Sequence, residues 1–91
     1  MLVVNESKFA YDFVFNGYRK IIVSKSKLYK FLVCLDQEIP FTDGQKTVTF
    51  SKKSGATVMN NQLNGKSFSI KLFDSERQEM YDWIKNQDPL P

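Results

Sequence analysis

Hydrophobic and polar positions alternate along the chain with two different periods, and these periods predict its secondary structure. Residues 9–15 place an aromatic side chain at every second position, which is typical of a half-buried β-strand. The Asn16-Gly17 pair that follows favours a two-residue hairpin turn, because this turn requires a positive φ at both positions. Residues 18–23 are therefore predicted to form the partner strand.

A two-residue turn also fixes which residues of this hairpin lie opposite each other. The predicted pairs are Phe15 with Tyr18, Phe13 with Lys20 and Tyr11 with Ile22. On the other face, Asp12 is then within reach of a cross-strand pair with Arg19.

The aromatic face of this hairpin has two interpretations. An exposed row formed by Phe9, Tyr11, Phe13 and Phe15 could stack nucleic-acid bases. We predict instead that it is core, because each large apolar side chain contributes roughly 1.5–3 kcal/mol on burial. Tyr11 and Tyr18 are expected at the rim of the core, since their hydroxyl groups need water or a polar partner.

A helix is predicted to follow the hairpin. Ser24 or Ser26 can cap its start, and Pro40 stops it after about Ile39. Its apolar residues recur with a period of about 3.6 and form one buried stripe. The stripe consists of Leu28, Phe31, Leu32, Leu35 and Ile39.

The second half of the chain predicts three strands and a closing helix. Residues 41–44 are predicted to form a turn, and the strands are separated by turns at Ser54-Gly55 and Asn64-Gly65. The closing helix is predicted to begin at Ser75, with Gln78 completing a capping box, and to end before Pro89. The three strands are predicted at residues 47–51, 56–60 and 67–73.

This order of elements, ββαβββα, predicts the fold class. Short hairpins join consecutive strands, so we expect an α+β fold with a small, mainly antiparallel sheet of about five strands. Two helices are expected to pack on one face of the sheet. No linker, repeat or low-complexity segment interrupts the chain, so residues 1–91 are predicted to form a single compact domain.

Composition narrows the chemistry that the protein can perform. The chain has no histidine and one cysteine, so the usual general bases and metal-ligand sets are missing. Cys34 falls at the edge of the apolar helix stripe and is predicted to be a packing residue rather than a nucleophile. We expect no enzymatic activity, no metal and no cofactor. No segment approaches the roughly 20 apolar residues that span a bilayer, so no membrane association is expected.

The net charge of +3 is unevenly distributed. Residues 44–73 contain five lysines and no acid, whereas residues 74–91 contain five acids against Arg77 and Lys85. Lysine is suited to sequence-independent phosphate contact, so the basic residues around the first hairpin and the second hairpin tip are candidates for partner binding. These candidates are Arg19, Lys20, Lys25, Lys27, Lys30, Lys52 and Lys53.

Aromatic side chains supply a second set of candidates. Tyr81 and Trp83 lie in the acidic closing helix, and Tyr11 and Tyr18 lie in the first hairpin. Trp and Tyr are enriched at the centres of protein interfaces, so each could contact a partner. For Trp83 we favour the alternative that it completes the core, because a small domain needs its large apolar residues inside.

These observations predict a non-enzymatic protein that binds a macromolecule. Lysine, phenylalanine, isoleucine, asparagine and tyrosine, which have AT-rich codons, are abundant. This bias and the small size favour a phage or mobile-element accessory factor that inhibits a host nucleic-acid-handling protein by occupying its surface. The expected partner has an acidic or nucleic-acid-binding surface.

Two alternatives stay open. The first is sequence-tolerant binding of DNA or RNA by the lysines. The second is a self-assembling subunit, such as a homodimer, in which the acidic residues 74–91 contact a basic face of another copy. The single cysteine cannot form a disulfide within the chain, so we expect the protein to lie in the cytoplasm, which is the host cytoplasm if the protein is phage-encoded.

Overall fold

The computed structural model describes residues 1–87, and these form seven strands and two α-helices, with a short 3₁₀ turn before the first helix. Pro89, the predicted stop of the second helix, lies outside the described residues. The elements are β1 (Leu2–Glu6), β2 (Ala10–Phe15), β3 (Arg19–Ser24), η1 (Lys25–Lys27), α1 (Leu28–Gln37), β4 (Phe41–Asp43), β5 (Lys46–Lys53), β6 (Ala56–Leu63), β7 (Lys66–Phe73) and α2 (Asp74–Lys85).

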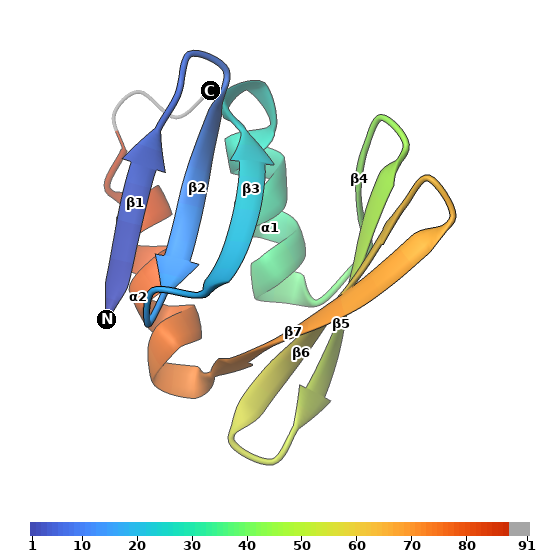
Figure 1. The fold of residues 1–91 in the computed structure, drawn as a ribbon. Helices are drawn as coiled ribbons and strands as arrows, with labels where there is room; N and C mark the ends of the chain where they lie inside the picture. The colour runs from blue at the N-terminus through green and yellow to red at the C-terminus, as the bar shows by residue number, and fades with distance from the viewer. Residues whose placement is uncertain (88–91) are drawn as a thin grey trace.

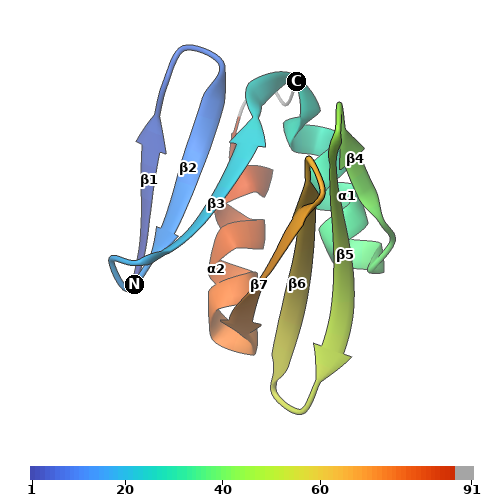
Figure 2. The same cartoon turned by 45° about the vertical axis from the view of Figure 1, so that its right-hand side comes forward.

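The predicted α+β class with antiparallel pairing is confirmed, but the strands form two sheets. Sheet A has the order β1-β2-β3, and sheet B has the order β4-β5-β6-β7. Figure 1 shows sheet A in front of both helices and sheet B set at an angle beside it. Both helices lie behind the two sheets in the rotated view of Figure 2. The prediction of one sheet with about five strands is therefore wrong.

The two missed strands are short and carry little pattern. In β1 only Leu2 and Val4 pack against the core, so an alternating signal hardly develops over its five residues. The predicted turn at residues 41–44 is in part β4, whose Phe41 is buried and pairs with Val48. The chain turns only after Asp43.

The register of the first hairpin differs from the prediction by one residue. Residues 16–18 form the loop, so Phe15 pairs with Arg19 and Phe13 pairs with Ile21. A shift of one residue exchanges the two faces of a strand, and here it buries Ile21 and Val23 instead of Lys20 and Ile22. The burial of two β-branched apolar side chains therefore overrides the two-residue turn that Asn-Gly favours.

The predicted aromatic core is correct for Phe13 and Phe15, which are both fully buried. It is wrong for Phe9, whose residue surface is 74 % exposed. The strand begins only at Ala10, because residues 7–10 form a turn in which the Ser7 backbone N–H donates to the Ala10 carbonyl. Phe9 lies in this turn, before the start of β2.

The helix boundaries also shift, because the predicted caps are not used. Ser24 donates its hydroxyl to Asp43 over 2.7 Å instead of capping α1, and Glu38 ends that helix in a left-handed conformation. At the start of α2, Phe73 occupies the N-cap position. The Glu76 carboxylate accepts the Phe73 backbone N–H over 3.0 Å, so the predicted Ser75–Gln78 box is replaced by an earlier start.

The core lies between the helices and the inner faces of both sheets. Sheet A, sheet B, α1 and α2 all contribute fully buried apolar side chains to one cluster. The cluster consists of Phe13, Phe15, Ile21, Val23, Leu28, Phe31, Leu32, Cys34, Leu35, Phe41, Val48, Met59, Ile70, Leu72, Met80 and Ile84. Neither described helix is long and apolar enough to cross a membrane.

Candidate functional site

Arg19 was predicted to bind a partner, but it is an internal link between sheet A and α2. Its guanidinium makes a two-pronged ion pair with Glu76, over 2.8 and 2.6 Å, and also donates to the Lys71 carbonyl over 2.6 Å. Only 13 % of the Arg19 side chain and 9 % of the Glu76 side chain are exposed. Hydrogen bonding to Arg19 lowers the pKa of Glu76 against the opposing effect of burial. The Arg19 guanidinium therefore has a structural role, because its hydrogen bonds join β3 to β7 and α2.

Three further candidate lysines are placed away from the helix start. Lys20 lies 3.9 Å from Asp12 and takes the cross-strand position predicted for Arg19. Lys52 pairs with Asp74 over 3.1 Å. Lys53 ends β5 and forms no ion pair within the described part of the chain. Figure 1 places the β2–β3 and β5–β6 turns at the end of the molecule opposite the start of α1.

The other three candidate lysines lie together with residues that the sequence did not single out. The backbone N–H of Lys25 donates to the carbonyl of Phe9 over 2.8 Å, which joins the β1–β2 turn to η1. This bond brings Lys8 and Phe9 to the end of the molecule where α1 begins (Figure 1). We call this surface the lysine end, and it comprises Lys8, Phe9, Lys25, Lys27 and Lys30.

The lysine end is basic and carries an unusual exposed aromatic ring. Lys25 pairs with Glu6 over 2.5 Å, while Lys8, Lys27 and Lys30 form no ion pair with any described residue. The ammonium of Lys8 lies 5.3 Å from the centre of the Phe9 ring. Four lysines, one acid and an exposed phenyl ring are suited to a polyanion that also presents flat apolar groups.

Three of the aromatic candidates, Tyr11, Tyr81 and Trp83, pack against the core. Trp83 makes edge-to-face contacts with Tyr11 and Phe13, at ring-centre distances of 5.0 and 5.3 Å. Tyr11 is half-buried beneath the ammonium of Lys25, 5.2 Å from its ring centre. Trp83 and Tyr11 therefore have structural contacts that account for their aromatic side chains.

Tyr18 and Tyr81 differ in exposure. Tyr18 is 76 % exposed in the β2–β3 loop, at the end of the molecule opposite the lysine end. Tyr81 is half-buried and lines the cleft between α1 and α2. The structure thus does not bring the four aromatic candidates into one surface.

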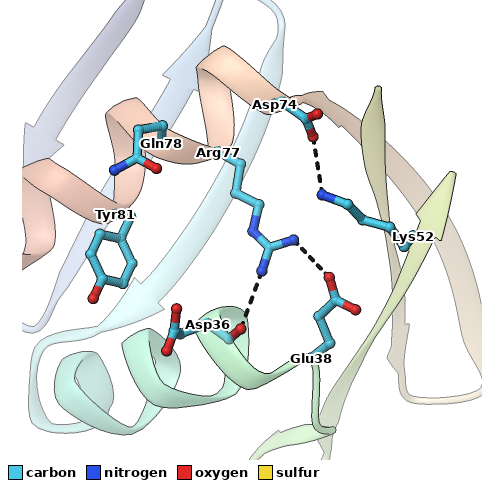
Figure 3. Close-up of a pocket in the computed structure, with 7 residues that line it drawn as sticks. All are labelled: Asp36, Glu38, Lys52, Asp74, Arg77, Gln78 and Tyr81. Carbon is cyan, nitrogen blue, oxygen red and sulfur yellow. Dashed lines mark hydrogen bonds and ion pairs between the residues drawn. The ribbon is translucent and has the colours of Figure 1, made fainter. Parts of the chain in front are cut away.

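A charged cleft of about 330 Å³ lies between α1, α2 and β5 (Figure 3). Arg77 crosses it and donates to the Leu35 carbonyl over 2.6 Å, to Glu38 over 2.8 Å and to Thr57 over 2.9 Å. These acceptors include the Leu35 carbonyl in the last turn of α1, where carbonyl groups lack partners within the helix. Arg77 therefore fixes the end of α1, and its charge is already neutralised by Glu38.

The acidic side chains of α2 are used within the same chain. Asp74 pairs with Lys52, Glu76 pairs with Arg19, and Glu79 accepts the Leu2 backbone N–H over 3.3 Å. Within the described residues this leaves less free negative charge on α2 than the sequence suggests. Self-assembly through residues 74–91 stays a prediction that these pairs do not favour.

Cys34 is buried and has the contacts of a packing residue. Its thiol lies 3.6 Å from the Pro40 carbonyl, and burial raises its pKa. A thiol with a raised pKa forms less thiolate, which is the reactive species.

A groove of about 260 Å³ opens between the edge of sheet A and the inner face of sheet B. Leu63 and Phe68 share this inner face with the buried Met59 and Ile70, yet they remain 42 and 52 % exposed. Ile22, also exposed, lines the opposite wall on β3.

Comparisons with protein-family models, curated proteins and solved structures give no match to this chain. The described residues also contain no group of three or more potential metal-ligating side chains. The lysine end and the groove are therefore interpreted from their own geometry.

Proposed function

We propose that the protein is a non-enzymatic binding protein that holds single-stranded nucleic acid at the lysine end without reading its sequence. The observation that carries this proposal is the 2.8 Å hydrogen bond from the Lys25 backbone to Phe9, which brings the exposed phenyl ring and Lys8 to the end of the molecule where Lys25, Lys27 and Lys30 begin the helical segment. Lysines neutralise phosphates, and an aromatic ring stacks on any base. Duplex DNA offers no free base faces to Phe9, so we expect it to bind more weakly.

Fluorescence anisotropy with a labelled thymidine dodecamer tests this proposal. We expect measurable binding at about 50 mM salt, with a log–log salt slope of about −2 to −3 if three or four phosphates are contacted. The double variant Lys27→Glu/Lys30→Glu should bind at least about tenfold more weakly, because it replaces two attractions by two repulsions. The Phe9→Ser variant should lose about tenfold through lost stacking.

Matched variants at other surfaces serve as controls. Lys53→Glu/Lys66→Glu makes the same change in net charge on exposed lysines of β5 and β7. Tyr18→Ser removes an equally exposed aromatic ring at the other end of the molecule. Equal losses in the control and lysine-end variants would show that only overall charge matters. Absence of binding even at low salt would reject the proposal.

The exposed apolar groove favours a second candidate function, which is binding to a protein. On this proposal the chain is a phage or mobile-element accessory factor that occupies the surface of a host protein in the cytoplasm. The groove supplies an apolar contact surface with basic surroundings, formed by Lys20 and Lys46. Such a surface suits a partner with acidic residues, in agreement with the partner chemistry expected from the charge distribution.

A further inference from the structure

We infer that the groove between β3 and sheet B binds an extended protein segment that alternates apolar and acidic residues, and that this segment adds to the free edge of β3. The inference concerns a different surface from the lysine end and does not depend on nucleic-acid binding. It rests on three features: an open strand edge, an uncovered apolar sheet face and a cationic border.

The open edge is visible in the hydrogen bonding of β3. Its other edge is paired with β2, and β3 is the last strand of sheet A. The carbonyl of Ile22 accepts the ammonium of Lys46 over 2.8 Å, so it points away from β2. Because backbone groups alternate in an antiparallel pair, those of Lys20 point to the same edge. The Lys20 groups can pair with one further strand, and the Ile22 carbonyl can do so once the Lys46 ammonium is displaced.

The apolar wall faces this edge. Leu63 and Phe68 project from the inner face of sheet B, and Ile22 lies on β3 across the groove. Asn61 is 2 % exposed at the bottom of the groove and donates its side-chain amide to the Met59 carbonyl. Alternate side chains of an added strand would point into this wall, which selects for an apolar residue at every second position.

The charge of the groove selects acidic residues at the intervening positions. Lys20 and Lys46 line it, whereas Asp12, which lies 3.9 Å from Lys20, and Asp43, which lies near Lys46, are not among its described lining residues. Lys46 is half-buried against the Ile22 carbonyl, and this burial lowers its pKa. A lysine on a strand edge discourages unselective pairing. A peptide carboxylate can bind the Lys46 ammonium in place of the Ile22 carbonyl, which leaves this carbonyl free to pair with the added strand.

A second copy of the chain fits the groove less well. Pairing of two β3 strands about a twofold axis brings Lys20 of one copy toward the edge that carries Lys20 and Lys46 of the other. Like charges that face each other across a strand pair are destabilising. An acidic partner removes this repulsion, which is why we assign the groove to a different polypeptide.

The test is an NMR titration of the ¹⁵N-labelled protein with a capped peptide of about eight residues that alternates valine and aspartate. We expect amide shifts confined to β3 and to the groove-lining ends of β5, β6 and β7. The Phe68→Ser variant should weaken binding by about tenfold, and Lys46→Glu by at least as much. Phe68 is half-exposed, so its replacement should leave the fold intact.

Three controls make the result decisive. Phe73→Ser changes an equally exposed phenylalanine on the same strand but the other face, and should bind the peptide normally. A peptide with lysine in place of aspartate, and one with alternate backbone nitrogens methylated, should both fail to bind. Shifts outside the groove, unchanged binding to Phe68→Ser, or displacement of the peptide by the thymidine dodecamer would overturn the inference. So would a dimer held by the groove in sedimentation analysis without peptide.

Discussion

Replacement of Glu76 by alanine is expected to lower the free energy of unfolding by about 3 kcal/mol, because it leaves the Arg19 guanidinium buried without its counter-charge. The lost carboxylate also accepts the Phe73 backbone N–H at the start of α2. The loss is a large part of the roughly 5–14 kcal/mol available to a chain of this size. Urea unfolding followed by circular dichroism measures it.

Two variants separate the ion pair from its surroundings. Glu76→Gln keeps an oxygen for the Phe73 N–H but removes the charge, so it should cost less than Glu76→Ala. Lys52→Ala breaks a pair whose side chains are both about half exposed, and it should change stability by less than about 0.5 kcal/mol. Equal effects of Glu76→Ala and Lys52→Ala would contradict the assignment of the Arg19–Glu76 pair to the interior.

The same pair gives the stability a defined pH dependence. Glu76 has its pKa lowered below the ordinary value of 4.5 in the folded state, mainly by the hydrogen bond from Arg19. The folded state therefore holds this proton less tightly than the unfolded state does. The contribution of this ion pair to the free energy of unfolding is complete above about pH 4.5 to 5. It is lost as the pH falls through the lowered pKa of Glu76 in the folded state. The difference in free energy of unfolding between the native protein and Glu76→Gln should thus shrink on acidification. A constant difference down to about pH 3 would contradict the lowered pKa of Glu76.

The rarity of arginine among the basic residues indicated a structural role that the sequence interpretation missed. The chain has two arginines among its 13 basic residues, and both form several hydrogen bonds inside the structure. Arginine is suited to this role because its planar group can donate in several directions at once. Arg19 could have been separated from the surface lysines on this ground. Its partner Glu76, 57 positions away, could not have been identified without the fold.

The two Asn-Gly pairs show which features of a hairpin can be predicted from its turn sequence alone. Asn64-Gly65 forms the expected two-residue hairpin, with Leu63 paired to Lys66. Asn16-Gly17 also adopts positive φ at both residues, yet its loop has three residues. The difference arises because burial of Ile21 and Val23 sets the register of the first hairpin. The dipeptide predicts the place of a turn, while packing with the rest of the chain decides the pairing.

The candidate sites were predictable only in part for the same reason. Sequence placed Lys25, Lys27 and Lys30 near one another because they share the start of a helix. Phe9 joined them through a backbone hydrogen bond that depends on the true start of β2. The groove required knowledge that the sheet breaks between β3 and β7, and no local pattern marks such a break.

Replacement of Trp83 by alanine is expected to lower the free energy of unfolding by about 3 kcal/mol, which would identify it as a core residue rather than an interface residue. Its ring contacts Tyr11 and Phe13 edge to face and connects α2 to sheet A. Trp83→Phe keeps an aromatic ring in place and should cost roughly a third as much. Tyr29→Ala, which removes a half-exposed ring from α1, should have little effect.

The measurement must use circular dichroism, because Trp83 is the only tryptophan and its replacement removes the intrinsic fluorescence signal. A Trp83→Ala protein as stable as the native one would leave the ring free to serve a partner, as the alternative interpretation holds. The expected result is instead a destabilised protein whose affinity for the thymidine dodecamer is retained under conditions where it is folded. Retained affinity is expected because Trp83 supports β2 from the core side, whereas the proposed ligand contacts, Phe9 and the lysines, lie at the end of the molecule.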